Sequence, residues 1–311
     1  VGLARKIGMD EAVARFHSIN YDGIIVMFDA DSHCDKNYLS EIIGHFEINP
    51  KTPGCSIQFE HPIKGVEFSP EIYSGIIKYE LFLRYYIEGL RVANLPYAFH
   101  TVGSSMAVRS SAYQKQGGMN KRKAGENFYF IQKIIELGNY TELNTTRVIP
   151  SPRTSDRVPF GTGKAINDWL LQESENYMTY SPQTFYDLHE FTKNIDSLFE
   201  SNDWAQFCSP CLKDYLIQNK FSEALLEIRK NSTNKTGFVK RFYTWFNAFR
   251  VLKFVHFARD NHYTKVEIEK ASQVLSKSEH LNTIKLLNEY RYMQKKIRLI
   301  SETGFEKVKL F

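Results

Sequence analysis

The sequence predicts an α/β protein with a mostly parallel sheet flanked by helices, followed by a helical C-terminal region. Short apolar runs such as residues 23–28 and 55–59 alternate with helical patterns as far as about residue 180. Beyond that point the strand patterns fade and helical periodicity dominates. We therefore expect two parts, residues 1–180 and residues 181–311.

The elements of the first part follow one another in a regular order. Helical periodicity covers residues 2–17, 35–46 and 70–90, and Pro70 suits the first turn of the third helix. Strand-type runs cover residues 23–28, 55–59, 106–108 and the segment TRVIPSPR. A Gly- and Lys-rich loop, QGGMNKRKAG, then leads into the helical segment ENFYFIQKIIELG, which ends at a glycine.

Composition limits the classes of protein that need to be considered. The 311 residues are 42% hydrophobic and 24% charged, which is ordinary for a globular protein. The net charge of +5 fits an anionic substrate, and without a dense Lys/Arg block we expect no nucleic-acid partner. Four cysteines give no disulfide framework, and neither a bilayer-length apolar run nor a secretory signal is visible. We expect a cytoplasmic protein.

Two acids follow the first apolar run in the segment FDADS. Asp29 and Asp31 would lie at the carboxyl end of a parallel strand, where open α/β sheets bind ligands. Two neighbouring carboxylates repel each other, and a divalent cation relieves that repulsion. The pattern predicts a Mg²⁺ or Mn²⁺ ion that bridges to a diphosphate. The alternative is one helix-capping Asp and one solvated Asp.

Four segments in a fixed order carry a resemblance to a known family. They are ARKIGMDEA, FDADS, the block FHTVGSSMAVRSSAYQKQGGMNKRKAGENFYFIQKI and SPRTSDRVPFGTG. Over about residues 1–165 the chain resembles the family 2 glycosyltransferases, which have the GT-A fold. In the middle block the family has a small-residue stretch, a Gly-Gly turn and an acidic pair opening a helix. The matching positions here are Gly103, Ser104 and Ser105, then Gly117 and Gly118, then Glu126 and Asn127.

The resemblance implies inverting transfer of a sugar from a nucleotide-diphosphate donor to a hydroxyl of a saccharide or glycoconjugate acceptor, in polysaccharide or glycoconjugate synthesis. A metal at Asp29 and Asp31 would neutralise the leaving diphosphate. Cations near the diphosphate would assist, with a solvated surface charge as the alternative role for each. These candidates are Arg5, Lys6, Arg153 and Arg157. On the acceptor side we place Gly103, Ser104, Ser105 and also His100, which a structural, hydrogen-bonded role would equally explain.

The general base is where the chain departs from the family. The second acid of the pair usually has that role, and here the position is Asn127, whose amide cannot accept a proton. Glu126 can take over the role, another acid can serve, or the chain is catalytically impaired by a natural or engineered change. We expect Glu126 to be the base, and the alternative for it is a Glu stabilised by the helix dipole.

A second departure concerns the front of the domain. GT-A folds open with strands that bind the nucleotide base, and by this resemblance we expect the chain to start after them, in the helix before FDADS. We therefore expect an N-terminally incomplete GT-A-like domain that binds sugar nucleotides poorly.

Three other functions are compatible with parts of this pattern. A dehalogenase-type phosphatase also has D-x-D after a strand, but it needs a later acidic pair, which the sequence does not show. A nucleotidyltransferase needs an N-terminal Gly-rich phosphate loop, which is not visible in the sequence either. A transferase-derived sugar-binding or scaffold protein remains as the alternative. Residues 237–257 predict one helix with an aromatic and apolar face and basic residues elsewhere; that face contains Phe238, Phe242, Trp245, Phe249 and Leu252. Core packing is the favoured explanation, and peripheral contact with the inner membrane face is the alternative. We interpret Cys208 and Cys211 as ordinary cysteines.

Overall fold

The chain forms two compact units that are interleaved in sequence. The computed structural model describes residues 2–121, 125–156, 159, 161–174, 176–278 and 281–302, with side chains as far as Lys296. Within these residues, unit 1 contains 2–84, 99–174 and 283–302, and unit 2 contains 85–98 and 176–282. A single division near residue 180 does not reproduce this interleaving, because the last helix belongs to unit 1 and residues 85–98 belong to unit 2.

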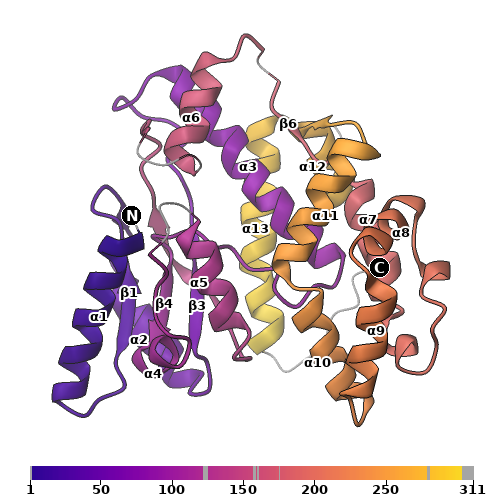
Figure 1. Cartoon of the computed structure of the whole chain (residues 1–311). Coiled ribbons are helices and arrows are strands. Elements are labelled where there is room, and N and C mark those ends of the chain that lie inside the picture. Colours follow the sequence, from indigo (N-terminus) through magenta and orange to yellow (C-terminus); the bar gives the residue numbers. More distant parts are fainter. Residues whose placement is uncertain are drawn as a thin grey trace. The chain divides into compact units, whose positions relative to one another are not determined.

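Unit 1 is an α/β unit built on a five-stranded sheet (Figure 1). Its strands are β1 (Ile24–Met27), β2 (His33–Cys34), β3 (Gly54–Phe59), β4 (Met106–Arg109) and β5 (Thr141–Ile149). Its helices are α1 (Gly2–Ser18), α2 (Tyr38–Ile48), α3 (Pro70–Val92) as far as Arg84, α4 (Ser110–Lys115), α5 (Glu126–Ile135), α6 (Thr162–Leu171) and α13 (Thr283–Glu302).

The sheet is mixed, whereas the sequence predicted a mostly parallel one. Its order is β1-β4-β3-β5-β2, and only the β3–β5 pair among these strands is parallel. The prediction depended on continuous apolar strands, which report burial on both faces of a sheet rather than strand direction. The strand β4 has three buried apolar residues, 106–108, and lies between β1 and β3, yet it runs against both of them.

Helices cover both faces of this sheet, and alternate residues of each strand enter different cores. On one face, Ile25, Met106 and Val108 pack with residues of α1, α4 and α5, such as Met9 and Phe130. On the other face, residues of α2 cover Ala107 and its neighbours. This second core contains Tyr38, Ile42, Phe46, Cys55, Ile57, Ala107, Leu143 and Val148.

A three-residue irregularity interrupts β5. Leu143 pairs with Ile57, but the next pair is Arg147 with Gln58, so residues 144–146 lie outside the ladder. Bulges of this kind re-aim side chains and occur often beside functional sites.

Unit 2 is helical, with one small two-stranded sheet. Its elements are the end of α3, β6 (Met178–Thr179), α7 (Gln183–Thr192), η1 (Ile195–Phe199), η2 (Ala205–Phe207), α8 (Pro210–Gln218), α9 (Phe221–Lys230), α10 (Lys235–Trp245), α11 (Ala248–Asn261), β7 (Val266–Glu267) and α12 (Ile268–Ser276). Phe191 contacts the rings of Phe221, Phe242 and Phe246 at centroid distances of 5.8–6.0 Å. These rings form the core of the unit.

The aromatic stripe at residues 237–257 belongs to this core in its first half. Phe238 and Phe242 are fully buried, which confirms the core-packing interpretation for these two residues. The predicted single helix is divided into α10 and α11, because the Asn247 side chain accepts hydrogen bonds from the backbone N–H groups of Phe249 and Arg250 and caps a new helix.

None of the helices in the described part of the chain combines the length and the apolar character that crossing a membrane requires.

Candidate functional site

The predicted site residues gather at one edge of the unit 1 sheet. The strands β1, β3 and β5 run in the same direction, since β4 is antiparallel to both β1 and β3 and β5 is parallel to β3. Their carboxyl ends therefore share one edge. Asp29 and Asp31 follow β1 there, Arg153 follows β5, and Gly103 lies just before the start of β4.

Asp29 and Asp31 flank a tight turn. The backbone N–H of Ser32 donates to the carbonyl of Asp29 at 3.0 Å, so the chain reverses directly after the strand. Both side chains remain accessible, with 45% of the Asp29 side chain and 38% of the Asp31 side chain exposed. The two carboxylates are thus presented at the sheet edge, as the sequence predicts.

Arg5 connects three segments that lie far apart in the sequence. Its Nη2 donates to Asp29 Oδ1 at 2.7 Å, and its Nη1 donates to the carbonyl of Gly103. Its Nε lies 3.6 Å from Glu126 Oε1. One guanidinium on α1 therefore holds the end of β1, the turn before β4 and the start of α5 together.

Gly103 is required where Asn127 approaches the turn. A Cβ atom at position 103 would lie 2.1 Å from Asn127 Nδ2 and 2.5 Å from Arg5 Nη1, so no larger residue fits without displacement. Asn127 Oδ1 is buried and has no hydrogen-bond partner among the described residues. An unpaired buried amide oxygen costs about 1–3 kcal/mol, and groups of this kind call for an explanation.

Glu126 is the first residue of α5 and is 3% exposed. Gly125 before it has a φ of 70°, a left-handed conformation that glycine adopts without strain. A carboxylate at a helix N-terminus is favoured by the helix dipole, so this position alone explains a Glu. Its approach to Arg5 adds an ion pair and brings it to the same guanidinium as Asp29.

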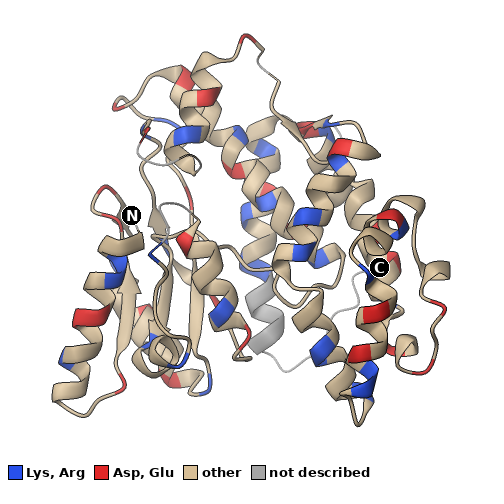
Figure 2. Ribbon diagram, in the orientation of Figure 1, with Lys and Arg blue, Asp and Glu red and all other residues tan. Residues whose placement is uncertain are grey.

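The other predicted cations are placed differently. Arg153 Nε pairs with Asp31 Oδ2. Lys6 Nζ instead pairs with Asp10 at 2.7 Å, one turn along α1, where basic and acidic bands alternate in Figure 2. That contact lowers the pKa of Asp10, with a hydrogen bond from Tyr113 adding to the effect. Arg157 lies outside the described residues.

The predicted acceptor-side residues are buried. His100, Ser104 and Ser105 are each no more than 4% exposed. The His100 ring packs edge-on against Phe59, and its carbonyl accepts a hydrogen bond from Ser56 at 2.6 Å. These contacts agree with a structural role for His100, whereas Gly103 contacts the Arg5 cluster through its carbonyl.

The donor set allows a divalent cation but does not enforce one. No group of three or more His, Cys, Asp or Glu side chains that could hold a metal occurs among the described residues. Mg²⁺ commonly takes only one or two carboxylates and completes its shell with water and phosphate oxygens, so Asp29 and Asp31 suffice chemically. In this structure Arg5 and Arg153 neutralise one oxygen of each acid.

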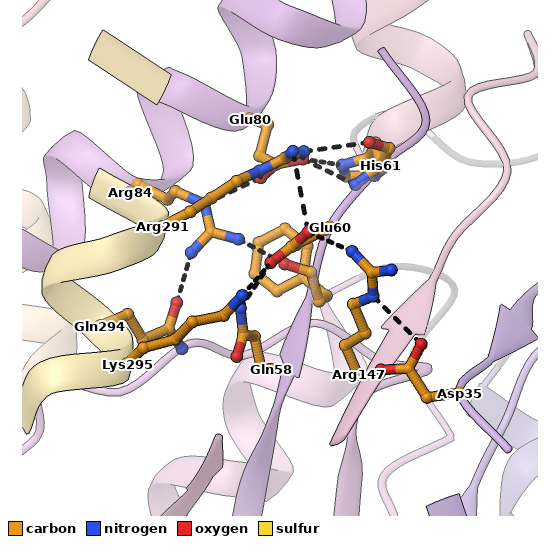
Figure 3. Close-up of polar contacts among 11 residues, drawn as sticks. Asp35, Gln58, Glu60, His61, Glu80, Arg84, Arg147, Arg291, Gln294 and Lys295 are labelled. Atoms are coloured by element: carbon orange, nitrogen blue, oxygen red, sulfur yellow. Dashed lines mark hydrogen bonds and ion pairs between the residues drawn. The ribbon is translucent and has the colours of Figure 1, made fainter. Parts of the chain in front are cut away.

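A second polar cluster in unit 1 was not predicted from the sequence (Figure 3). Glu80 is fully buried on α3 and accepts hydrogen bonds from Arg84 Nε at 2.8 Å and Arg291 Nε at 2.7 Å. The backbone N–H of His61 donates to it at 2.7 Å. Although burial alone would raise it, these cations and hydrogen bonds hold the pKa of Glu80 well below its usual value.

Glu60, beside this cluster, links it to β5 and α13. It accepts hydrogen bonds from Gln58 at 2.7 Å and from Arg147, and Lys295 Nζ lies 3.1 Å away. Burial raises its pKa and the cations lower it, with a net decrease. No sequence motif could reveal this network, because its members lie more than 200 residues apart, as Glu80 and Arg291 do.

The two cysteines of the CSPC segment are free thiols with raised pKa values. Burial raises the pKa of the Cys208 thiol and of the Cys211 thiol to about 12, and both are free thiols. A thiol with such a pKa is not a ready nucleophile near neutral pH.

Comparison with models of known protein families, with curated protein sequences and with solved structures gave no match. The function proposed below therefore depends on the residues and the geometry described above.

Proposed function

We propose that the chain is a metal-dependent inverting glycosyltransferase of the GT-A type, which moves a sugar from a nucleotide-diphosphate donor to the hydroxyl of a saccharide or glycoconjugate. The observation that carries the proposal is the convergence on Arg5. Three segments that the family resemblance marks independently, represented by Asp29, Gly103 and Glu126, contact this one side chain. An arginine with only a structural role would need just one of these contacts.

Each residue of the cluster has a role that its position supports. A divalent cation bound by Asp29 and Asp31 would supply Lewis-acid neutralisation of the leaving diphosphate. Arg5 and Arg153 contact these acids, so their remaining N–H groups would be close enough to donate to the phosphate oxygens of a donor bound there. Glu126 would accept the proton of the acceptor hydroxyl on its carboxylate, within the same cluster.

The test is metal-dependent release of a nucleoside diphosphate. The chain is incubated with Mn²⁺ and millimolar UDP-, GDP- or ADP-sugars plus oligosaccharide acceptors, and the released diphosphate is measured. We expect release from at least one donor, and a loss of at least about 100-fold in Asp31→Ala. Glu11→Gln is the matched control, because Glu11 is an exposed acid that pairs with Arg15 one turn away on α1.

Binding of Mn²⁺ and UDP is measured in parallel by calorimetry. Asp31→Ala should weaken Mn²⁺-dependent UDP binding, whereas Glu11→Gln should not. Equal Mn²⁺ affinity in the wild type and Asp31→Ala, together with no diphosphate release from any donor, would contradict the proposal.

The second candidate is a transferase-derived saccharide-binding protein without activity. Asn127 at the position of the family's base and the arginine partners of both acids favour it. Saccharide binding that Asp31→Ala abolishes, without diphosphate release from any donor, would identify this function instead.

A further inference from the structure

A polar pocket on unit 1 lies outside the cluster around Arg5. It has a volume of about 300 Å³, at the lower end of the range for small-molecule sites. Its lining residues are Asp35, Gln58, Asn144, Thr145, Thr146, Arg147 and Lys295. None of them is a candidate residue of the transferase site, so the pocket requires an explanation of its own.

The bulge in β5 creates this pocket. Residues 144–146 leave the ladder between the Ile57–Leu143 and Gln58–Arg147 pairs, and all three line the cavity. Thr146 is 2% exposed and Asn144 is 8% exposed, yet Thr146 Oγ1 and Asn144 Oδ1 have no hydrogen-bond partner among the described residues. Two unpaired polar atoms in one buried wall each cost about 1–3 kcal/mol unless something in the pocket pairs with them.

The charged side chains at the pocket are already paired, which favours a neutral occupant. Arg147 and Lys295 supply two positive charges, and Asp35 and Glu60 supply two negative charges bonded to them. Figure 3 shows Arg147 and Asp35 on one side of Glu60, with Gln58 and Lys295 on the other. An anion would meet Asp35 and Glu60, and a cation would meet Arg147 and Lys295, so neither gains a net attraction.

The charged side chains are also fixed in place. Burial disfavours the cation, but the hydrogen bonds to Glu60 and Asp35 hold the pKa of Arg147 above its usual value. Asn144 Nδ2 donates to the carbonyl of Gln294 at 2.9 Å, which orients its unpaired oxygen. The pocket therefore has a preformed wall that contains a hydroxyl, an amide oxygen and paired charges.

We propose that this pocket binds a neutral polyhydroxylated ligand, of the class of a monosaccharide or one sugar unit of a chain. Each hydroxyl of such a ligand both donates and accepts, so it can donate to Asn144 Oδ1 and pair with the Thr146 hydroxyl. The volume of the pocket is too small for a nucleotide sugar, whereas a single sugar unit has a suitable size. This inference stands without the proposed transferase activity.

The experiment uses D-glucose, D-galactose, D-mannose and N-acetyl-D-glucosamine, each titrated to about 50 mM without metal. Saturation-transfer NMR and thermal denaturation report binding. We expect at least one sugar to bind saturably and to raise the melting temperature, as a ligand selective for the folded state does. Thr146→Val keeps the shape of the side chain and removes the unpaired hydroxyl, so the affinity should fall at least about fivefold.

The variant gives a second readout in the free protein. Because the Thr146 hydroxyl has no described partner, Thr146→Val should raise the melting temperature without ligand while it weakens sugar binding. Thr244→Val is the matched control, since Thr244 is exposed on α10, does not line the pocket, and its hydroxyl donates to the carbonyl of Lys240 at 3.0 Å.

Three results would overturn the inference. One is that none of the four sugars binds, which would leave ordered water as the only occupant. Another is that Thr146→Val binds the sugars as the wild type does. The third is that Asp31→Ala abolishes sugar binding while Thr146→Val does not, because the sugar would then occupy the carboxylate site. Failure of the transferase assay alone leaves all three readouts unaffected.

Discussion

Arg5 and Asp29 form an ion pair of 2.7 Å between the first helix and the end of the first strand of unit 1. The same guanidinium lies 3.6 Å from Glu126, which is almost completely buried. A helix residue thus neutralises an exposed acid and a buried acid together. This arrangement makes Arg5 a structural element of unit 1 as well as a candidate ligand for phosphate.

Arg5→Met is expected to lower the free energy of unfolding by about 3 kcal/mol, because it leaves the Glu126 carboxylate buried without a cation. Urea denaturation followed by circular dichroism measures this loss. Arg15→Met is the matched control on the same helix: its pair with Glu11 is exposed, so the change should stay within about 0.5 kcal/mol. Equal effects of the two substitutions would show that Arg5 has no buried partner in solution.

The buried carboxylates of the second cluster predict acid sensitivity. The pKa values of Glu60 and Glu80 are lower in the folded protein than the ordinary value of 4.5, so the unfolded chain binds protons more readily. Their contribution to stability is complete above that pH and is lost as the pH falls below it. Hydrogen exchange of α13 amides should therefore be constant between about pH 7 and pH 5, after correction for intrinsic rates, and opening should increase at lower pH.

Glu80→Gln is the variant that tests this assignment. It leaves Arg84 and Arg291 without their shared carboxylate, and it should reduce stability at pH 7 by about 3–5 kcal/mol. It should also make the acid dependence of α13 opening shallower than in the wild type. If the acid dependence of α13 opening were the same in Glu80→Gln as in the wild type, other carboxylates would be responsible for it.

Local features of unit 1 could be predicted from sequence, and long-range pairing could not. The helix at 2–17 and the strand at 23–28 correspond to α1 and β1, since periodicity and apolar runs depend on neighbouring residues. The predicted direction of β4 was wrong, because a strand that is buried on both faces has the same apolar pattern in either direction. The β5 bulge, and with it the pocket at Thr146, has no local signal in TELNTTRVI.

The candidate site shows the same division. Motif order identified Asp29, Gly103 and Glu126, and the structure brings them to one side chain. Arg5 and Lys6 are adjacent in sequence and both are cations. They differ in the face of α1 on which they lie, which the sequence motif does not reveal. Arg5 faces the sheet edge, whereas Lys6 pairs with Asp10.

Gly103→Ala tests the close contact between the turn and Asn127. The added Cβ would lie 2.1 Å from Asn127 Nδ2, so we expect a loss of about 1–3 kcal/mol in unfolding free energy. Gly8→Ala is the control: it lies within α1 with no atom near the new Cβ, and it should stabilise by up to about 1 kcal/mol. In a double-mutant cycle with Asn127→Ala, the cost of Gly103→Ala should decrease. Additive effects would mean that the two residues do not touch.

Glu126 and Asn127 are adjacent at the start of α5, and the general base is assigned to Glu126. If the chain transfers sugar as proposed, Glu126→Gln removes the proton acceptor and should lower turnover about 10²–10⁴-fold with little change in Mn²⁺-dependent UDP binding. Asn127→Asp is the isosteric comparison. Because Asn127 is not the base in this assignment, the change should alter turnover less than about threefold, provided that circular dichroism shows the same fold. A large gain in Asn127→Asp, retained in the double variant with Glu126→Gln, would contradict the assignment. The acid would then be required at position 127, as in the family, and Glu126 would serve only to stabilise the helix N-terminus and to pair with Arg5.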